Sequence, residues 1–533
     1  MKFRLIGAAT VAALMAGSAQ AEMVLHILHT NDVHSRIEPV NKYDSTCDAE
    51  TLAAGECFGG VARIATKVRE LRDQITAGGG NVLVLDAGDQ YQGSLFFSTY
   101  KGEEVVEFMT AIGYDAMAVG NHEFDKGPEG LAVLTNGVAF PVTSGNLDLS
   151  QSDLLKDQVE GALTLDVGGE KVGIVSALAT DTPETSVPGD AVIFMDDIES
   201  LKAQAQALGD QGVNKIVALT HVGYHRDQEI AAQVPGIDVV IGGHSHTLLG
   251  DMEGAEGPYP TMTAGIDGSE VPVATAYAYS KFLGHLVLTF DDEGKLLGAE
   301  GQPVLLDNSV PEDQAIAARI KEMAAPIEEL RNRQVAHLGV ALDGDRATCR
   351  AGECAMGDVI ADAMLARVSD QGISIAIQNG GGVRASINAG PVMMGEVLTV
   401  LPFQNTLSTF QVTGADILAA LENGASQIEE GGGRFAQVAG LKYSVDRAAD
   451  VGSRISGVMV AANGEWAAID PAATYGVVSN NFVRRGGDGY TAFAANATNV
   501  YDFGPDLADV LAEYLAAQGP DFAPAPDGRI TVH

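Results

Sequence analysis

Basic residues, cysteines and long hydrophobic runs are all scarce in this sequence, and each scarcity excludes a class of protein. Lysine and arginine total 32 against 71 aspartates and glutamates, which gives a formal net charge of -39. Nucleic acid polymers and anionic membranes require a basic surface, so we expect neither as a partner. The acidic excess indicates little else, because acidic surfaces are usually solvated faces without a partner.

The hydrophobic runs are too short to span a membrane. Apolar residues 5–15 fall short of the roughly 20 that a bilayer requires, and no later run approaches that length. Lys2 and Arg4 precede this stretch and Ala19-Gln20-Ala21 follows it, which is typical of a signal peptide (residues 1–21) cleaved after Ala21. The cleavage point lacks a lipid-accepting cysteine, and residues 523–533 lack the hydrophobic tail of a GPI signal. We therefore expect a periplasmic or secreted protein without a membrane anchor.

Only four cysteines are present, namely Cys47, Cys57, Cys349 and Cys354. In an exported chain they fit two disulfides, and pairing of near neighbours would close short loops, although sequence does not strictly fix the connectivity. A zinc site at Cys349 and Cys354 would need two further soft ligands nearby, and the sequence offers none. Disulfides are therefore favoured.

The chain is long enough for more than one hydrophobic core. It has 533 residues, of which 46% are hydrophobic and 19% are charged, as in a globular protein. At about 100 to 200 residues per domain, two to four domains are expected.

Five short apolar runs in the first half of the chain each lead to side chains that bind metals. The runs are residues 23–28, 82–85, 116–119, 216–219 and 239–241. The side chains that follow them include Asp32, His34, Asp89, Asn121, His122, His221, His244 and His246. Such runs read as buried strands, and in α/β sheets ligands gather beyond the carboxyl ends of the strands. We therefore expect all five clusters to meet in one crevice.

The ligand types predict a pair of divalent first-row cations. Carboxylate, imidazole and amide donors without a thiolate favour zinc, with manganese, cobalt or iron as alternatives, over calcium. Such a pair supports in-line displacement at phosphorus by activating a bridging water. Asp89 is the natural bridge, because a carboxylate has two oxygens to share. We assign Asp32 and His34 to one ion, and to the other Asn121, His221 and His244.

Most histidines in proteins are ordinary hydrogen-bonded residues, and single ligand-like motifs are common by chance. The histidines assigned to this ordinary class are His26, His29, His225, His285, His337 and His533. His29 lies beside the first cluster.

A domain boundary is predicted near residue 308. Residues 308–313 contain a cap candidate, an early proline and acidic residues, which together indicate the start of a helix. This helix should run through residues 315–323 and kink or end at Pro326. The predicted division is a first domain at 22–308, a linker helix at 309–337 and a second domain at 338–533.

Several motifs resemble the metallophosphoesterase motifs of the 5'-nucleotidase family. They are residues 27–34, Gly88-Asp89 with Gly93-Ser94, residues 120–125 and residues 242–246, and the match continues from residue 271 to the C-terminus. That family includes bacterial periplasmic nucleotidases and UDP-sugar hydrolases and the animal ecto-5'-nucleotidases. The resemblance implies an α/β protein in which an N-terminal αββα sandwich holds two metals. A linker helix would join it to a C-terminal α/β substrate-binding domain.

The resemblance also assigns roles that spacing alone does not. His122 would stabilise charge on the transferred phosphoryl group or protonate the leaving alkoxide, and Asp125 would orient it. An aspartate three residues on can accept a proton from one ring nitrogen and raise the histidine pKa. His246 would be a further metal ligand, at a position where family members carry different amide or imidazole side chains. Both cysteine pairs have counterparts as disulfides in the ecto-nucleotidase branch.

In the second half of the chain, glycine-rich turns follow apolar runs at residues 378–384 and 479–490. Alone they are weak evidence, since tight turns need glycine for ordinary backbone reasons. The resemblance makes Phe403 and Phe482 a base-stacking slot, although as bare residues they would more often be core aromatics. It also implies that ribose or phosphate oxygens contact the remaining substrate residues, which are Arg350, Asn379, Gly381, Arg384 and Asp488.

These features together predict an exported dimetal phosphohydrolase that removes the 5'-phosphate from nucleoside monophosphates such as AMP, by attack of a metal-bridging hydroxide. Family members also rotate the C-terminal domain to load substrate. UDP-sugar diphosphatase and 2',3'-cyclic-nucleotide phosphodiesterase activities are alternatives that the base slot does not distinguish. A base slot argues against a substrate of carrier-bound sulfur oxyanions. His122 and Asp125 argue against a binding module without catalysis.

Overall fold

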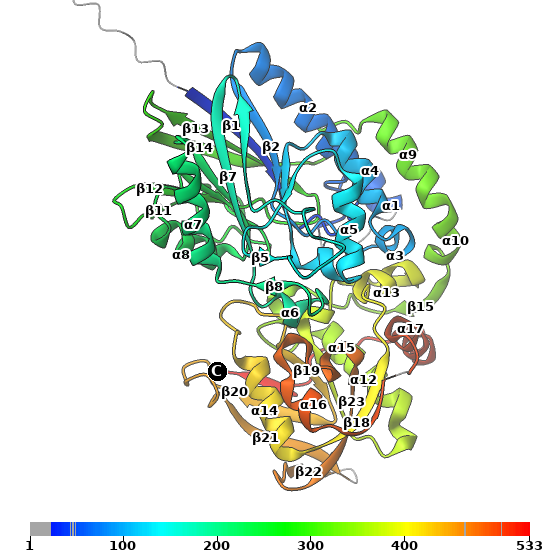
Figure 1. Ribbon diagram of the computed structural model, residues 1–533. Coiled ribbons are helices and arrows are strands. Elements are labelled where there is room, and N and C mark those ends of the chain that lie inside the picture. The colour runs from blue at the N-terminus through cyan, green and yellow to red at the C-terminus, as the bar shows by residue number, and fades with distance from the viewer. Residues whose placement is uncertain (1–22, 43, 45–46, 48, 463–464, 503) are drawn as a thin grey trace, which may run out of the picture.

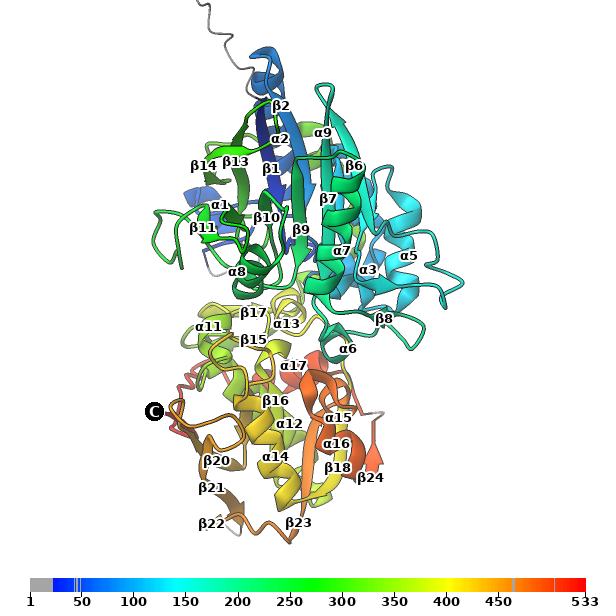
Figure 2. The ribbon, with the colours of Figure 1, turned by 60° about the vertical axis from the view of Figure 1, so that its left-hand side comes forward.

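The computed structural model describes residues 23–42, 44, 47, 49–462, 465–502 and 504–533. The predicted signal peptide, residues 1–21, lies outside the described residues. Two domains lie end to end, the N-terminal one coloured blue to green and the C-terminal one yellow to red (Figures 1 and 2). Within the described part of the chain, no helix has the length and apolar character needed to cross a membrane.

The N-terminal domain contains two six-stranded sheets. The first has the order β14-β13-β1-β2-β3-β4, with β14 (Leu296–Leu305), β13 (Phe282–Phe290), β1 (Met23–Thr30), β2 (Asn81–Asp86), β3 (Ala116–Ala118) and β4 (Val142–Thr143). The second has the order β11-β12-β10-β9-β7-β6, with β11 (Thr261–Ala264), β12 (Glu270–Ala274), β10 (Val239–Ile241), β9 (Ile216–His221), β7 (Glu170–Leu178) and β6 (Ala162–Val167). All five apolar runs singled out in the sequence are strands, three in the first sheet and two in the second.

Helices cover the outer face of each sheet. On the first sheet, α2 (Val61–Ala77) packs against β2 and β13, beside α4 (Glu103–Ile112) and α5 (Pro128–Gly137). On the second, α7 (Asp197–Asp210) packs against β7, and α8 (Tyr224–Gln233) against β10, β11 and β12. The short helices α1 (Ala49–Ala54) and α3 (Leu95–Tyr100) complete the layer over the first sheet. The predicted αββα sandwich is confirmed.

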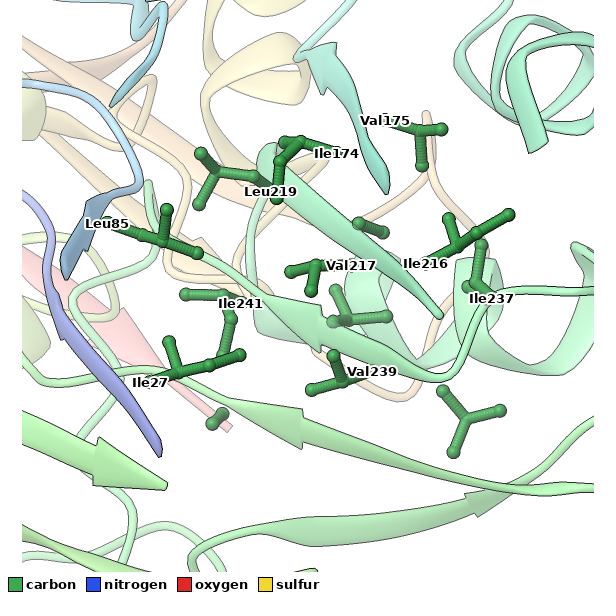
Figure 3. Packing of buried hydrophobic residues seen from close by; sticks show 14 of the residues in the cluster. Ile27, Leu85, Ile174, Val175, Ile216, Val217, Leu219, Ile237, Val239 and Ile241 are labelled. Carbon is green, nitrogen blue, oxygen red and sulfur yellow. The ribbon is translucent and has the colours of Figure 1, made fainter. Parts of the chain in front are cut away.

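The inner faces of the two sheets form one hydrophobic core. Ile27 of β1 and Leu85 of β2 meet Val217 and Leu219 of β9 and Ile241 of β10 (Figure 3). Each of these side chains is at most 1% exposed. Because β1, β2 and β3 run parallel, as do β7, β9 and β10, each set ends at one edge of its sheet. This arrangement brings the loops after both sets of strands together.

The linker contains a helix, α9 (Gln314–Ala324), followed by a 3-10 turn (Ala325–Ile327) and α10 (Glu328–Arg331). Asp313 caps α9 by accepting backbone N–H bonds from Ala315 and Ile316. Pro326 lies in the 3-10 turn, which agrees with the expected break. Residues 334–337, which the sequence assigned to the linker helix, instead belong to strand β15 (Gln334–Leu338). That strand pairs with β17 (Gly390–Met393), a distant partner that a local helical pattern does not reveal.

The C-terminal domain is built on a five-stranded sheet of order β19-β16-β23-β18-β24, comprising β19 (Ala436–Ala439), β16 (Ile375–Asn379), β23 (Thr474–Asn480), β18 (Leu407–Thr413) and β24 (Thr498–Tyr501). Its two faces are covered by α12 (Ala355–Val368) with α17 (Leu507–Gln518), and by α14 (Gly414–Ala425) with α16 (Thr491–Asn496). A smaller sheet has the order β22-β21-β20-β25, comprising β22 (Glu465–Ala468), β21 (Ile455–Ala462), β20 (Leu441–Val445) and β25 (Ile530–Val532). The parallel strands β16 and β23 both end toward the N-terminal domain.

Both cysteine pairs form disulfides between near neighbours. The S–S distance is 2.12 Å for Cys47–Cys57 and 2.04 Å for Cys349–Cys354. The second disulfide joins the short helix α11 (Arg346–Cys349) to the start of α12. It therefore fixes the segment that carries Arg350.

Candidate metal centre and substrate cleft

The loops that follow the five predicted strands converge on one buried site. Asp32 and His34 follow β1, Asp89 follows β2, and Asn121 opens the 3-10 helix η1 (Asn121–Phe124) after β3. In the second sheet, His221 ends β9, and His244 and His246 follow β10. Most of these side chains are almost inaccessible, with Asp32, His34 and His221 at 0% exposure. The structure thus brings all seven predicted metal ligands together.

The candidate ligand atoms form three groups, of which the third, with His34, Asp89 and His122, shares one residue with each of the other two. In the first, Oδ1 of Asp32 lies 3.8 Å from Nε2 of His34 and 3.2 Å from Nε2 of His246. In the second, Oδ2 of Asp89 lies 3.1 Å from Nε2 of His221, and His244 completes the set. Oδ2 of Asp89 is also 3.9 Å from Nε2 of His34, so Asp89 lies between the groups. Nδ1 of His244 is 2.9 Å from Oδ1 of Asn121, which places the amide beside the second group.

The donor set fits divalent cations. Oδ1 of Asp32 and Nε2 of His221 are buried and lack a hydrogen-bond partner within the described residues. Burial raises the pKa of Asp32 to about 6, because no water solvates its carboxylate. Carboxylate oxygens and imidazole nitrogens at these separations can share a cation, and the described residues place no thiol among them. The groups are thus arranged in a way that suits a bound cation.

Contacts behind the ligands fix their orientation. Nδ1 of His221 lies 2.6 Å from the Ala87 carbonyl oxygen, and Nδ1 of His34 lies 3.1 Å from that of Tyr91. Donation to these carbonyls leaves both Nε2 atoms directed at the site, where they could bind a metal. The backbone is also unusual at five ligand positions, where φ is between 50° and 78°, namely Asp32, His34, Asp89, His244 and His246. Non-glycine residues in this region are strained, and such strain gathers at functional sites.

Glu123 joins two of the ligand loops. Its carboxylate accepts backbone N–H bonds from Asp89 (3.0 Å), Gln90 (2.9 Å), Tyr91 (3.1 Å) and Gly120 (2.7 Å). Glu123 is 0% exposed, so these four bonds lie in the protein interior. Three of them come from the loop after β2, and the Asp89 side chain adds a fourth bond between the loops by accepting the His122 backbone N–H at 2.8 Å. The loops after β2 and β3 are therefore held as one unit.

His122 and Asp125 form a hydrogen-bonded pair at the edge of this site. Nδ1 of His122 lies 2.7 Å from Oδ2 of Asp125, and the His122 ring lines the cavity described below. Burial alone would lower the pKa of His122, but the carboxylates of Asp125 and Asp89 outweigh it and raise the pKa above its ordinary value. The remaining nitrogen, Nε2, is therefore suited to donate a proton into the cavity.

A cavity of about 370 Å³ lies between the two domains. From the N-terminal domain, its walls include Asp89, Asn121, His122, His244 and His246. From the C-terminal domain, its walls include every predicted substrate residue, namely Arg350, Asn379, Gly381, Arg384, Phe403, Phe482 and Asp488. Four of the seven predicted metal ligands thus share one cavity with all the predicted substrate residues, although the two sets come from different domains.

Phe403 and Phe482 are partly exposed in this cavity, whereas Phe410 and Phe493 nearby in the sequence are at most 1% exposed. The Phe403 ring centroid is 5.8 Å from that of His122, across the domain interface. Asp488 has φ of 54° in the 3-10 turn η5 (Gly487–Gly489), and its Oδ2 accepts an N–H bond from Asn379 at 2.6 Å. The rings of Phe403 and Phe482 are therefore available to a ligand, which distinguishes them from core side chains.

Three arginines make the cavity attractive to anions in an otherwise acidic chain. Arg350 and Arg384 line it with exposures of 7% and 8%, and Arg346 lines it as well. Nη2 of Arg384 lies 3.2 Å from Nε2 of His34, and Nη2 of Arg346 donates to the His244 carbonyl oxygen at 3.4 Å. Both arginines thus extend from the C-terminal domain to the metal-ligand loops.

Sequence reasoning missed Arg346 and the connecting role of Glu123. Arg346 stands four residues before Arg350, a spacing that places two side chains on one face of a helical turn and was the available signal. Glu123 belongs to a motif quoted from the sequence, but nothing local indicates that its carboxylate reaches another loop. Among the described residues, the metal-ligand groups include none of the histidines assigned to the ordinary class. His29, for example, contacts the Tyr259 hydroxyl at 2.7 Å.

Comparisons with known proteins agree with this geometry. Residues 25–248 match the family model of the calcineurin-like phosphoesterases, and residues 334–495 match that of the 5'-nucleotidase C-terminal domain. The chain is 38% identical to a snake venom 5'-nucleotidase from Naja atra, over 95% of this chain and 98% of that one. It is 38% identical to a 5'-nucleotidase from Homo sapiens, over 95% and 90% of the two chains. It resembles the crystal structure of a 5'-nucleotidase precursor from Thermus thermophilus with a TM-score of 0.90 and 40% identity, over 96% and 99% of the chains.

Proposed function

The chain belongs to the 5'-nucleotidase family, and we propose that it hydrolyses nucleoside 5'-monophosphates such as AMP to a nucleoside and phosphate. One observation carries the proposal: a single interdomain cavity is lined by dimetal ligands on one side and by two partly exposed phenylalanines on the other. A phosphate bound at the ligand groups leaves its nucleoside to extend toward the phenylalanines. The cavity therefore suits a nucleotide better than phosphate alone.

Two divalent cations fit the ligand set. Asp89 would be shared, one cation would take Asp32, His34 and His246, and the other would take Asn121, His221 and His244. When bound, such cations activate water and neutralise the charge that develops on phosphoryl oxygens. We propose zinc as the native metal because imidazole donors dominate the set, with manganese, cobalt or iron as alternatives.

Side chains of the protein then donate the proton and bind the phosphate. His122, with its pKa raised by carboxylates, protonates the leaving oxygen as the phosphorus–oxygen bond breaks. Arg350 and Arg384 balance the phosphate charge and orient it, because guanidinium groups match phosphate oxygens. Both are buried in the cavity wall, where their attraction for an anion is strengthened by the exclusion of water.

The nucleoside is bound by the C-terminal domain. Phe403 and Phe482 offer aromatic faces to a base, and stacking tolerates different bases because each has a π-face. Asp488 accepts hydrogen bonds from the ribose hydroxyls, in a position that Asn379 stabilises. Gly381 lies in the same wall, where its backbone comes within 2.7 Å of Gly433 through an N–H to carbonyl bond, so a side chain there would crowd the turn.

We also propose that the protein works outside the cytoplasm, in the periplasm or the extracellular space. Its two disulfides persist in oxidising compartments, and they hold loops that contribute to the C-terminal substrate wall and to the N-terminal domain. The signal-peptide pattern of residues 1–21 supports the same conclusion.

The decisive experiment compares phosphate release from AMP, UDP-glucose and 2',3'-cyclic AMP by the same purified protein, with and without EDTA. We expect AMP to be hydrolysed fastest, EDTA to abolish activity, and added zinc or manganese to restore it. Faster turnover of UDP-glucose or of the cyclic nucleotide would replace the proposed activity with one of those alternatives. Nucleotide binding without turnover in the metal-loaded protein would make it a binding module.

A further inference from the structure

Asp125 has a second partner besides His122. Its Oδ2 bonds the His122 imidazole at 2.7 Å, and its Oδ1 accepts a bond from the Ser186 hydroxyl at 2.8 Å. Each carboxylate oxygen therefore has its own donor. Ser186 is 7% exposed, so this bond is largely protected from water. With both oxygens held, the carboxylate cannot rotate without breaking a buried hydrogen bond.

Ser186 directly follows the short helix α6 (Thr182–Thr185), whose segment is tied to β9 by the Ala179 backbone N–H, which donates to the His221 carbonyl oxygen at 2.9 Å. The Thr182 hydroxyl donates to the Ala179 carbonyl oxygen at 2.7 Å, and the Ser186 backbone N–H donates to the Thr182 carbonyl oxygen at 2.8 Å. Figures 1 and 2 show α6 at the junction of the two domains. The serine is therefore fixed by a segment that lies at the domain interface.

The same segment packs against the nucleoside side of the cavity. Helix α6 contacts η5, the turn that carries Asp488. Asp181, Thr185 and Ser186 all line the cavity with Asp488. One face of this segment thus contacts the turn proposed to bind ribose, while Ser186 contacts the carboxylate that orients His122.

We propose that Ser186 is a positioning residue for proton transfer from His122, and that it links the geometry of the His122–Asp125 pair to the docked position of the C-terminal domain. The inference rests on the proposed 5'-nucleotidase function. In the step concerned, a water-derived oxygen bonds to phosphorus as the bond from phosphorus to O5' breaks, the electron pair of that bond moves to O5', and Nε2 of His122 gives its proton to O5'. Asp125 stays ionised and Ser186 keeps its own proton, so their role is orientation alone.

The test uses three substitutions of the full-length, metal-loaded protein. Ser186→Ala removes the hydroxyl, Ser186→Val removes it while adding bulk, and Ser186→Thr restores it in a side chain of the same shape as valine. The backbone at Ser186 is extended, with φ of -151° and ψ of -161°, which β-branched residues adopt readily. For AMP, we expect kcat to fall about 10-fold in the alanine and valine variants and less than 2-fold in the threonine variant, with KM little changed.

Two further readouts separate positioning from a merely structural role. The loss should be small with p-nitrophenyl phosphate, whose leaving group needs no proton, and metal content and melting temperature should match the unsubstituted protein. In a His122→Ala background, Ser186→Ala should cost no further activity toward AMP, because a residue that acts through His122 has nothing left to position.

Additive losses in the double variant, or equal behaviour of the threonine and valine variants, would overturn the inference. A rise in KM with unchanged kcat would also overturn it, by making Ser186 a substrate-binding residue. If the unsubstituted protein released no phosphate from AMP, the proposed function itself would fail, and that result is distinct from any difference among the Ser186 variants.

Discussion

At the scale of single residues, Asp89 lies between the predicted ligands of the first sheet and those of the second. Its Oδ2 lies near His221 and His34, and its Oδ1 accepts the His122 backbone N–H. We predict that Asp89→Ala loses most of its bound metal and at least about 10²-fold in kcat for AMP, because the shared ligand is removed. Elemental analysis and phosphate release would be measured on the same preparation.

The control for this substitution is Asp292→Ala, which removes an exposed carboxylate from the loop between β13 and β14. It should retain both metal and activity. Near-normal turnover of Asp89→Ala after metal removal and reloading would show that the two-metal assignment is wrong.

His122 contacts Asp89 through its backbone N–H but has a different proposed role. We predict that His122→Ala lowers kcat by roughly 10²-fold or more, the usual effect of losing a general acid or charge stabiliser, while metal content is unchanged. His337→Ala is the matched control, because His337 is exposed and bonds the Pro520 carbonyl oxygen far from the cavity. Loss of metal from His122→Ala would instead identify His122 as a ligand.

Asp238 provides a prediction about pH and stability away from the metal site. It precedes β10 and accepts the Ile216 backbone N–H at 2.7 Å, and burial raises its pKa to about 7. In the unfolded chain an aspartate titrates near pH 4. Between these values the folded protein keeps the proton that the unfolded chain has lost, so the Asp238 contribution to stability falls as pH rises.

Asparagine at this position retains an acceptor but does not titrate. We therefore predict that Asp238→Asn gains stability relative to the unsubstituted protein between pH 4 and pH 8, on the order of 2 to 4 kcal/mol. Urea unfolding of both proteins at pH 4, 6 and 8 would measure this difference. In Asp307→Asn the trend should reverse and should appear only below about pH 4, because the bonds from Ser309 lower the pKa of Asp307. A pH-independent difference for Asp238→Asn would contradict the assigned pKa.

At the scale of elements, Glu123 holds the loops after β2 and β3 together by accepting three backbone N–H bonds from residues 89–91, and it accepts a fourth from Gly120 in its own loop. A glutamine amide has one accepting oxygen and would direct its NH2 group at donors. We predict that Glu123→Gln lowers metal affinity about 10-fold or more, the usual cost of losing a group that orients ligands, and also lowers the melting temperature. Glu129→Gln, an exposed change in α5, should alter neither quantity. Unchanged metal affinity in Glu123→Gln would mean that other contacts hold these loops.

The convergence of the candidate metal ligands could be predicted from sequence because each lies within six residues of the end of an apolar run. The run before His221, for example, is a strand buried along its entire length, so the ligand pattern is local in the chain. The division of these strands between two sheets could not be predicted, because periodicity does not say which strands pair. β7 carries no predicted ligand and was not singled out, yet it pairs with β9 and completes the second sheet.

The roles of Glu123 and Ser186 could not be predicted for a related reason, because the residues that they contact lie far away in the sequence. Glu123 acts on residues 89–91, and Ser186 acts on Asp125, which precedes it by 61 positions. A serine after a short helix has no local feature that marks such a contact. The strand at residues 334–338 was missed in the same way, since its partner β17 lies more than 50 positions on. In each case the contact depends on a partner that is distant in the sequence, so residue type alone does not reveal it.

At the scale of the whole molecule, the two domains contribute different parts of the reaction. The N-terminal domain supplies every predicted metal ligand and His122, whereas the C-terminal domain supplies the phenylalanines and Asp488. The arginines of the C-terminal domain reach across the interface, as the contact between Arg384 and His34 shows. Recognition of the base should therefore be separable from the chemistry at phosphorus.

This separation predicts the behaviour of Phe403→Ala and Phe482→Ala. Each truncation should weaken nucleotide binding by about 1 to 3 kcal/mol through lost stacking, and the loss should raise KM for AMP more than it lowers kcat. Stacking far from phosphorus is present in the ground state and the transition state alike. p-Nitrophenyl phosphate has no base, so both variants should hydrolyse it almost as fast as the unsubstituted protein.

Phe410→Ala is the matched control, because Phe410 is 1% exposed and packs against Phe493 with a centroid distance of 5.0 Å. Its loss should lower the melting temperature by removing core packing, whereas the two cavity variants should melt near the unsubstituted protein. Equal losses with AMP and with p-nitrophenyl phosphate in well-folded Phe403 and Phe482 variants would contradict the stacking slot. The domain that carries these rings would then contribute to phosphate positioning alone, and the nucleoside would have to be recognised elsewhere in the cavity.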